Sequence, residues 1–352
     1  MRKLWLAAGI VLLLVMGTVL LTGCGRKEPV QKTVMVMDTV VTLTAVGEKA
    51  DAAVRESIVR LQEIDGMASL HGENSDLKKL ADAAGNGAWI PLHPEVFHML
   101  EVSQEYSRIS DGAWDVTAGP LVELWGIGTD KAKVPTETEL AQAKAKTGWQ
   151  KLELDPETKC ARLREPGMSL DLGGIAKGFA ADEVRKIYEQ YGIRDGLINL
   201  GASSIYALGK NTKGGSWRVG IRHPRSEDKE SRLGVVELSN AALSTSGDYE
   251  RFFEQAGVRY HHILDPRTGR PANSGAVSDT IVVDGSLPDA GMISDLLTTA
   301  VFVLGPEEGK AFLGKLPTEV RGMICDRRLQ LRTAHGFDEM LQQVQQDFSL
   351  AE

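Results

Sequence analysis

Apolar positions along this chain recur at two different periods, and the period separates the predicted strands from the predicted helices. From Thr33 onward, valine and leucine side chains stand among threonines at short intervals, a pattern typical of paired strands. Residues 196–200 and 217–221 are short apolar runs, which we interpret as buried strands.

The clearest helical period, with apolar side chains every three or four positions, covers residues 48–65. Further helices are predicted over residues 93–109, 136–146, 175–191, 289–304 and 337–347. Pro94 suits a first helical turn, and the Thr-x-x-Glu sequence that begins at Thr136 is a capping box. Strands and helices follow one another without a regular βαβ rhythm, so the predicted fold class is α+β rather than doubly wound α/β.

The first 24 residues have the layout of an export signal. Arg2 and Lys3 precede an apolar stretch from Leu4 to Leu21, and the stretch ends in Leu-Thr-Gly-Cys. This ending resembles the bacterial lipobox, whose cysteine, here Cys24, is lipidated and becomes the first residue of the mature protein. The alternative is an uncleaved anchor helix, because the apolar run is just long enough to span a bilayer.

Both interpretations predict an exported chain that is tethered to a membrane on its periplasmic or extracellular side. The predicted organisation is a lipoprotein signal peptide over residues 1–23, a lipidated cysteine and tether over residues 24–32, and one folded domain over residues 33–348.

The composition is that of an ordinary globular protein, with 42% hydrophobic and 25% charged residues, so a disordered or fibrous chain is excluded. A net charge of −8 argues against nucleic-acid binding, which depends on neutralising phosphates with Lys and Arg. Three cysteines are too few for a disulfide scaffold or a Cys-rich zinc site. Cys160 and Cys325 could pair outside the cytoplasm, and the sequence leaves that question open.

Four segments combine glycine, acid, base and hydroxyl residues in a way that a hydrophobic core does not need. They are residues 110–126, residues 171–178, residues 244–269 and residues 294–299. In the second segment a glycine pair stands at the start of a predicted helix, where backbone N–H groups and Lys177 are available to an anion. The spacing is not that of a Walker A loop, and a Gly-rich helix start is by itself more often structural.

The third and fourth segments each allow more than one interpretation. His261 and His262 could be metal ligands, could include a base, or could point to opposite faces of a strand, and their spacing favours the strand. Asp295 and Thr299 lie four residues apart, so both oxygens share one face of a helix. This pair suits Mg²⁺, although a solvated Asp beside a backbone-bonded Thr is the simpler alternative.

Taken together and in this order, the four segments resemble the bacterial FAD:protein FMN transferases, the ApbE family of flavin transferases. The likeness runs from Met37 to about Gly305, and its motifs include Asp-Gly-Ala-Trp-Asp-Val-Thr, Asp-Leu-Gly-Gly-Ile-Ala-Lys-Gly, Thr-Ser-Gly-Asp-Tyr and His-x-Leu-Asp-Pro-Arg-Thr-Gly. The resemblance implies an α+β fold, with mixed or antiparallel sheets flanked by helices and a flavin-binding cleft between subdomains.

The resemblance also implies an activity and its residues. FMN would pass from FAD to a threonine hydroxyl of an exported or membrane-bound flavoprotein domain, such as a respiratory electron-transfer subunit, with release of AMP and dependence on Mg²⁺. The metal would lie among the Gly174 carbonyl, Asp295 and Thr299, and the catalytic residues would be His262, Asp295 and Lys177. The residues expected to contact FAD are Met37, His71, Ala113, Trp114, Asp115, Asp171, Lys177, His262 and Ile263.

The sequence departs from the family pattern at three places. His71 stands where relatives often carry an aromatic residue, Trp114 stands where Phe is common, and the turn at residues 201–204 lacks the carboxylate often found there. The alternatives to a transferase are a Mg²⁺-dependent FAD pyrophosphatase that yields FMN and AMP, a lipoprotein that only binds FAD, and a solute-binding lipoprotein.

Overall fold

The computed structural model describes residues 28–69, 72 and 75–351. The predicted signal peptide, Cys24 and His71 lie outside the described residues, so their predicted roles stay predictions. Within the described part of the chain, no helix is both long and apolar enough to span a membrane.

A nine-stranded sheet forms the centre of the fold, in the order β1-β2-β6-β7-β10-β15-β16-β17-β19. Every neighbouring pair is antiparallel except the last, β17 with β19, which is parallel. The strands are β1 (Val30–Val36), β2 (Thr39–Val46), β6 (Asp195–Leu200), β7 (Ser204–Leu208), β10 (Ala241–Gly247), β15 (Ala276–Asp284), β16 (Val320–Asp326), β17 (Gln330–Ala334) and β19 (Ser349–Leu350).

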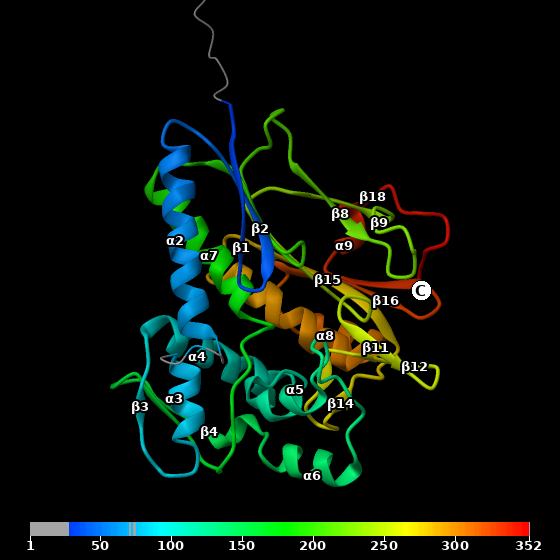
Figure 1. Ribbon diagram of the computed structural model, residues 1–352. Helices are drawn as coiled ribbons and strands as arrows, with labels where there is room; N and C mark the ends of the chain where they lie inside the picture. The colour runs from blue at the N-terminus through cyan, green and yellow to red at the C-terminus, as the bar shows by residue number, and fades with distance from the viewer. Residues whose placement is uncertain (1–27, 70–71, 73–74, 352) are drawn as a thin grey trace, which may run out of the picture.

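Three helices pack on one face of this sheet: α2 (Ala50–Ala68), α7 (Ala176–Gln190) and α8 (Ala290–Leu313) (Figure 1). Alternate residues of β15 divide between two cores, because successive side chains of a strand point to opposite faces. Ile281 and Val283 pack with the helices, and Val282 packs with the second layer. That second layer is a three-stranded sheet of β18 (Leu341–Gln342), β9 (Arg232–Leu238) and β8 (Trp217–Arg222), with helix α9 (Phe337–Met340).

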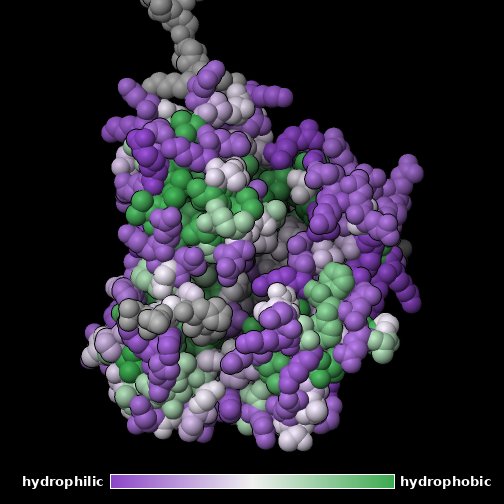
Figure 2. Space-filling view, in the orientation of Figure 1, coloured by the Kyte–Doolittle hydropathy of each residue, from purple (hydrophilic) through white to green (hydrophobic). Residues whose placement is uncertain are grey.

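A mainly helical region lies at the lower end of the view in Figure 1. It holds α3 (Asp76–Asp82), β3 (Ile90–Pro91), α4 (Pro94–Ile109), α5 (Gly119–Trp125), α6 (Glu137–Ala145), β4 (Leu152–Asp155) and β5 (Cys160–Leu163). Two short ribbons complete the chain, β11 (Phe252–Gln255) with β12 (Val258–His261) and β13 (Leu264–Asp265) with β14 (Arg270–Pro271). Figure 2 shows the surface hollowed near the middle of this face, between the upper and the lower regions.

Local sequence explains several helix ends. The predicted capping box of α6 is present: the Glu139 N–H donates to the Thr136 hydroxyl, and the Glu139 side chain accepts from the Thr136 N–H. Pro94 lies in the first turn of α4, as predicted. Helix α8 runs beyond the predicted end at residue 304, across a kink where Gly305 takes a φ of 82° and is followed by Pro306.

Two predictions about elements are wrong, and each has a physical reason. The helix predicted over residues 337–347 ends at Met340, and Leu341–Gln342 then pair with β9 as strand β18. The strand at residues 217–221 is not wholly buried, since Arg218 and Gly220 are exposed on the open face of the three-stranded sheet.

Cys160 and Cys325 are both free thiols. Cys325 lies on β16 with no exposed surface, and burial raises the pKa of its thiol to about 12. The sequence left their pairing open, and in the structure the two thiols are not joined.

Candidate functional site

The polar segments singled out from the sequence come together in the fold. The Asp171 N–H donates to the Val116 carbonyl at 2.8 Å, which joins the first segment to the second. The Gly178 N–H donates to the Asp295 carboxylate at 3.0 Å, which joins the second segment to the fourth. Residues that are far apart in the sequence therefore line one region at the start of α7 and α8.

The third segment meets the others through both of its halves. Ser244 on β10 shares a hydrogen bond of 2.9 Å with Ser294 on α8. Near the other end of the segment, the Gly269 carbonyl accepts a hydrogen bond of 2.8 Å from the indole N–H of Trp125. This second contact anchors the Asp-Pro-Arg-Thr-Gly turn on helix α5 of the lower region.

The glycine pair of the second segment lies where a side chain would not fit. A Cβ on Gly174 would come within 2.8 Å of the Trp114 ring and 3.0 Å of the Thr299 hydroxyl. Lys177 follows on the first turn of α7, and its ammonium donates to the Gly173 carbonyl at 3.0 Å. The backbone at this glycine pair is therefore closely packed, and the Lys177 ammonium lies beside it.

Asp295 makes contacts through both of its carboxylate oxygens, and its side chain is 6% exposed. Its Oδ2 accepts from the Gly178 N–H and lies 3.6 Å from the Lys177 ammonium. Its Oδ1 accepts from the Ser204 hydroxyl at 2.9 Å. Because each carboxylate oxygen has two acceptor positions, Asp295 keeps lone pairs available to a cation.

The donors near Asp295 fit a magnesium ion by their chemistry. The Asp295 carboxylate, the Thr299 hydroxyl and the Gly174 backbone offer hard oxygen ligands, and Thr299 is only partly buried. No group of three or more His, Cys, Asp or Glu side chains that could hold a metal ion occurs in the described residues. A cation here would therefore share its shell with water and phosphate oxygens, which is how Mg²⁺ is usually held.

His262 has its tautomer set by the backbone. The carbonyl of Arg251 accepts a hydrogen bond from the His262 N–H at 3.0 Å and lies 3.2 Å from His262 Nδ1. A carbonyl oxygen can only accept, so Nδ1 carries the proton and Nε2 of the neutral ring carries the lone pair. Burial lowers the pKa of His262, and the nearby charges of Arg251 and Lys177 lower it further.

The two adjacent histidines differ in burial, but the predicted strand alternation does not explain the difference, because β12 ends at His261 and His262 lies in the bend that follows. His261, at the end of β12, is 7% exposed, packs its ring edge-on to Phe302 and lies 3.0 Å from the Ala272 carbonyl through Nε2. His262 is only partly buried, and the charge of Lys177 acts on it. His261 is therefore a core residue, and His262 is the one available for chemistry.

Residues 113–115 are placed in the site but are turned inward. Ala113 is fully buried, and Trp114 is 4% exposed with its indole N–H unpaired among the described residues. The Asp115 oxygens accept from the N–H and hydroxyl of Thr117 and from the Trp149 N–H. Burial raises the pKa of Asp115 in spite of these hydrogen bonds. Their predicted contact with FAD stays a prediction, and the visible role of Asp115 is to hold this loop.

Met37, Asp171 and Ile263 complete the predicted set. Met37 is at the turn between β1 and β2 with a φ of 55°, and its N–H donates to Asp65. Asp171 accepts from the Gly173 N–H at 2.6 Å and so fixes the turn before the glycine pair. Ile263 is 4% exposed and belongs to the main core.

Three contacts of the predicted residues could not be inferred from the sequence. Ser204, the first residue of β7, donates to Asp295. The Gly178 N–H donates to the same side chain, and Arg251 holds His262 by its carbonyl. Each acts through a contact between segments distant in sequence, which a periodicity cannot reveal.

The fold is α+β, and its site brings a glycine-rich helix start, hard oxygen ligands and a histidine into one region. Comparisons with known proteins define the class. Residues 37–324 match the model of the ApbE family. The FAD:protein FMN transferase of Klebsiella pneumoniae is 35% identical over 264 residues, which cover 75% of this chain and 79% of that protein. The Treponema pallidum enzyme of the same name is 35% identical over 281 residues, or 76% and 75% of the two chains.

Solved structures give the same answer. The ApbE protein of Thermotoga maritima superposes with a TM-score of 0.80 at 27% identity, covering 89% of this chain and 99% of that one. The flavin transferase ApbE of Vibrio cholerae gives a TM-score of 0.78, also at 27% identity, with the same shares covered. The chain belongs to the ApbE family of flavin transferases, and the resemblance and fold class inferred from the sequence are confirmed.

Proposed function

We propose that this protein transfers FMN from FAD to a threonine hydroxyl of an exported or membrane-bound flavoprotein domain and releases AMP, in a reaction that depends on Mg²⁺. The threonine oxygen attacks the phosphorus that carries riboflavin. The bond from that phosphorus to the bridging oxygen breaks, and AMP leaves with that oxygen. The product is a phosphodiester between threonine and the flavin.

The observation that carries this proposal is that a neutral histidine, His262, and the ammonium of Lys177 belong to one site. His262 Nε2 has no hydrogen-bond partner in the described part of the chain and carries the lone pair, so it can accept the threonine proton. Lys177 lies close enough for its charge to lower the pKa of His262. The same ammonium would stabilise negative charge that develops on the phosphoryl oxygens.

Mg²⁺, held by Asp295, Thr299 and the Gly174 carbonyl, would supply charge stabilisation to the pyrophosphate and to the departing phosphate. The chain's own residues do the rest. Asp295 keeps Lys177 within 3.6 Å, and Lys177 in turn contacts the Gly173 carbonyl of the glycine pair. This arrangement fixes the Lys177 ammonium relative to the start of α7, where the positive end of the helix dipole favours an anion.

The test is to incubate the purified chain from Gly25 onward with FAD and Mg²⁺, with and without a domain that carries an acceptor threonine. Intact-protein mass and nucleotide chromatography are read together. An acceptor heavier by one FMN, with matching AMP, supports the proposal. FMN and AMP with an unmodified acceptor would indicate a pyrophosphatase, and bound intact FAD in both tubes would indicate a binding protein.

His262→Asn is the matched variant for this assay. We expect kcat to fall about 100- to 10,000-fold, the usual contribution of a general base, with FAD binding retained. The matched change His261→Asn should leave the apparent affinity for FAD unaltered while lowering stability, since His261 packs in the core. Equal loss of rate in both variants would contradict the assignment of the base to His262.

We further propose that the protein works as a lipoprotein on the exported side of a membrane. The support is the Leu-Thr-Gly-Cys ending of the first apolar stretch, at Cys24. Labelled palmitate should be incorporated into the protein in a bacterial host, and Cys24→Ala should abolish the label. Label that persists in this variant would contradict the proposal.

A further inference from the structure

Helices α7 and α8 both start without a cap of their own. An α-helix leaves its first N–H groups unpaired, and a side chain at the N-cap normally accepts from one of them. The N-cap of α7 is Ile175, which has no polar side chain, and the N-cap of α8 is Asp289, whose side chain makes no capping hydrogen bond. Asp289 instead pairs with His98 at 2.9 Å.

The first turn of each helix is capped by a carboxylate of the other helix. The Asp182 side chain on α7 accepts from the N–H groups of Gly291 and Met292 in the first turn of α8, both at 2.9 Å. In the opposite direction, Asp295 on α8 accepts from the Gly178 N–H in the first turn of α7 at 3.0 Å. The two helices therefore cap each other, with one carboxylate in each direction.

The close approach of the two helices makes this exchange possible. A Cβ on Gly178 would overlap the backbone carbonyl of Gly291, and a Cβ on Gly291 would overlap the carbonyl of Gly178. Only glycine at both positions brings the backbones near enough for short Asp side chains to reach the facing N–H groups. Asp182 is 1% exposed, so water does not compete for its two hydrogen bonds, and these hold its carboxylate in place.

We propose that Asp182 is a positioning residue for the site, because it holds the start of α8 and thereby sets Asp295 against Lys177 and Gly178. The consequence for the metal position rests on the function proposed above, whereas the coupling of the two caps does not. In the described part of the chain, Asp182 makes no hydrogen bond or ion pair with Lys177 or with a predicted metal ligand, so its effect must pass through α8.

The test is Asp182→Asn, which keeps the shape and places an NH₂ group against a backbone N–H. Amide hydrogen exchange is measured in the full chain at Met292, which Asp182 contacts, and at Gly178, which it does not. We expect exchange to accelerate about 5- to 10-fold at both, as loss of a capping carboxylate implies. Faster exchange at Met292 with unchanged Gly178 would overturn the proposal, because the caps would then be independent.

Two further measurements separate this proposal from the proposed function. Mg²⁺ binding, followed by calorimetry, should weaken about 10-fold or more in Asp182→Asn, the usual effect of disturbing a group that supports a ligand. Faster exchange at both Met292 and Gly178 with unaltered Mg²⁺ binding would support the coupling of the two caps and count against Asp295 as a Mg²⁺ ligand. Thr136→Ala, which removes the cap of the distant helix α6, is the control and should change neither Gly178 exchange nor Mg²⁺ binding.

The reverse substitution guards against failure of the first variant to fold. Asp295→Asn removes the cap of α7 from the other side. If the caps are coupled, exchange at Gly291 and Met292 must also accelerate, although Asp295 contacts neither amide in the structure. Unchanged exchange at both amides would overturn the proposal by itself.

Discussion

At the scale of single residues, the chemistry of this site depends on how each titratable side chain meets the backbone. His262 is the plainest case, because one carbonyl, that of Arg251, fixes which ring nitrogen is protonated. Asp115 shows the opposite outcome, since its oxygens are used within its own loop and toward Trp149. The type of a residue therefore does not tell whether its polar atoms remain available.

We expect His262 to stay neutral, with the proton on Nδ1, between pH 5 and pH 8. Its pKa is lowered by burial and by two cations, so the ring gains no proton in this range. Ring ¹⁵N chemical shifts measured through a pH titration check this. Arg251→Gln removes one of the cations and should raise the pKa of His262. A ring that titrates near pH 6.5 in the unsubstituted protein would contradict the expectation.

Asp279 is a buried carboxyl group that lowers stability at neutral pH. It has no exposed surface, and neither oxygen has a hydrogen-bond partner in the described residues. Burial raises the pKa of Asp279 well above its usual range, so the folded state holds a proton that the unfolded state releases. Above the unfolded pKa, stability therefore falls by up to about 1.4 kcal/mol for each pH unit until the folded pKa is reached.

Asp279→Asn removes this dependence, and we expect the variant to be more stable than the parent by a margin that grows between pH 5 and pH 8. Urea unfolding at several pH values measures the margin. The surface change Asp82→Asn serves as the control and should give a small difference, since Lys78 and Asp82 form only an exposed pair. If the stability advantage of Asp279→Asn over the parent shrank as the pH rose, the raised pKa of Asp279 would be contradicted.

At the scale of elements, the crossing of α7 and α8 determines the site more than any single side chain does. Lys177 is in the first turn of α7 and Asp295 is in the second turn of α8, and the glycines at the crossing bring their side chains within 3.6 Å. A helix start is usually capped by a neighbouring residue of its own chain segment, but here each helix is capped by a carboxylate of the other helix. Lys177 and Asp295 therefore come together only when the two helices cross at these glycines.

Gly178→Ala tests this crossing directly. The added methyl group would overlap the Gly291 carbonyl and approach Asp295, so we expect a loss of about 3 kcal/mol or more in unfolding free energy. Gly66→Ala is the matched control, because a Cβ at Gly66 in α2 meets no atom within 4 Å. That variant should gain up to about 1 kcal/mol, the usual preference for Ala over Gly in a helix. Equal effects from the two substitutions would show that the helices are not in contact as described.

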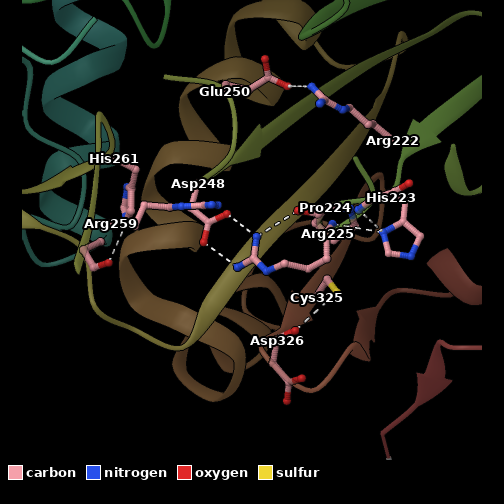
Figure 3. A network of polar contacts seen from close by, with 12 residues as sticks. Arg222, His223, Pro224, Arg225, Asp248, Glu250, Arg259, His261, Cys325 and Asp326 are labelled. Carbon is pink, nitrogen blue, oxygen red and sulfur yellow. Dashed lines mark hydrogen bonds and ion pairs between the residues drawn. The ribbon is translucent and has the colours of Figure 1, made fainter. Parts of the chain in front are cut away.

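At the scale of the whole molecule, the second sheet is tied to the first by ionic contacts. Figure 3 shows the guanidinium of Arg225, just beyond β8, facing the carboxylate of Asp248 at the end of β10. Both hydrogen bonds are 2.7 Å, and the Asp248 side chain is 12% exposed. Asp248 belongs to the Thr-Ser-Gly-Asp-Tyr motif, so the pair connects the outer sheet to a chain segment that leads toward His262.

Asp248→Asn should cost about 1–2 kcal/mol in unfolding free energy, since it leaves Arg225, whose side chain is 35% exposed and partly screened by solvent, with a neutral partner. A double-mutant cycle with Arg225→Met should give a coupling of about 1–2 kcal/mol. Glu254→Gln, which breaks an exposed pair with Arg259 on the β11–β12 ribbon, is the control and should cost less than about 1 kcal/mol. Additive effects of the two substitutions on the unfolding free energy would contradict an energetic coupling between Arg225 and Asp248.

The sequence by itself determined those features that depend on neighbours along the chain. Helical period, the Thr136 capping box and Pro94 placed the helices, and the four-residue spacing of Asp295 and Thr299 put both on one helix. The motif order was enough to identify the family. These signals survive without a structure because they arise from local geometry, which a short stretch of chain carries with it.

The tertiary structure decided everything that depends on contacts between distant segments. It set the tautomer of His262 through Arg251, gave Asp295 its partners Ser204 and Gly178, and turned the expected last helix into strand β18 beside β9. It also made Asp182 the cap of another helix, although nothing in its local sequence differs from an ordinary helical Asp. Such contacts are set by packing of the folded chain, where burial and hydrogen bonding compete across long sequence separations and local preference is overridden.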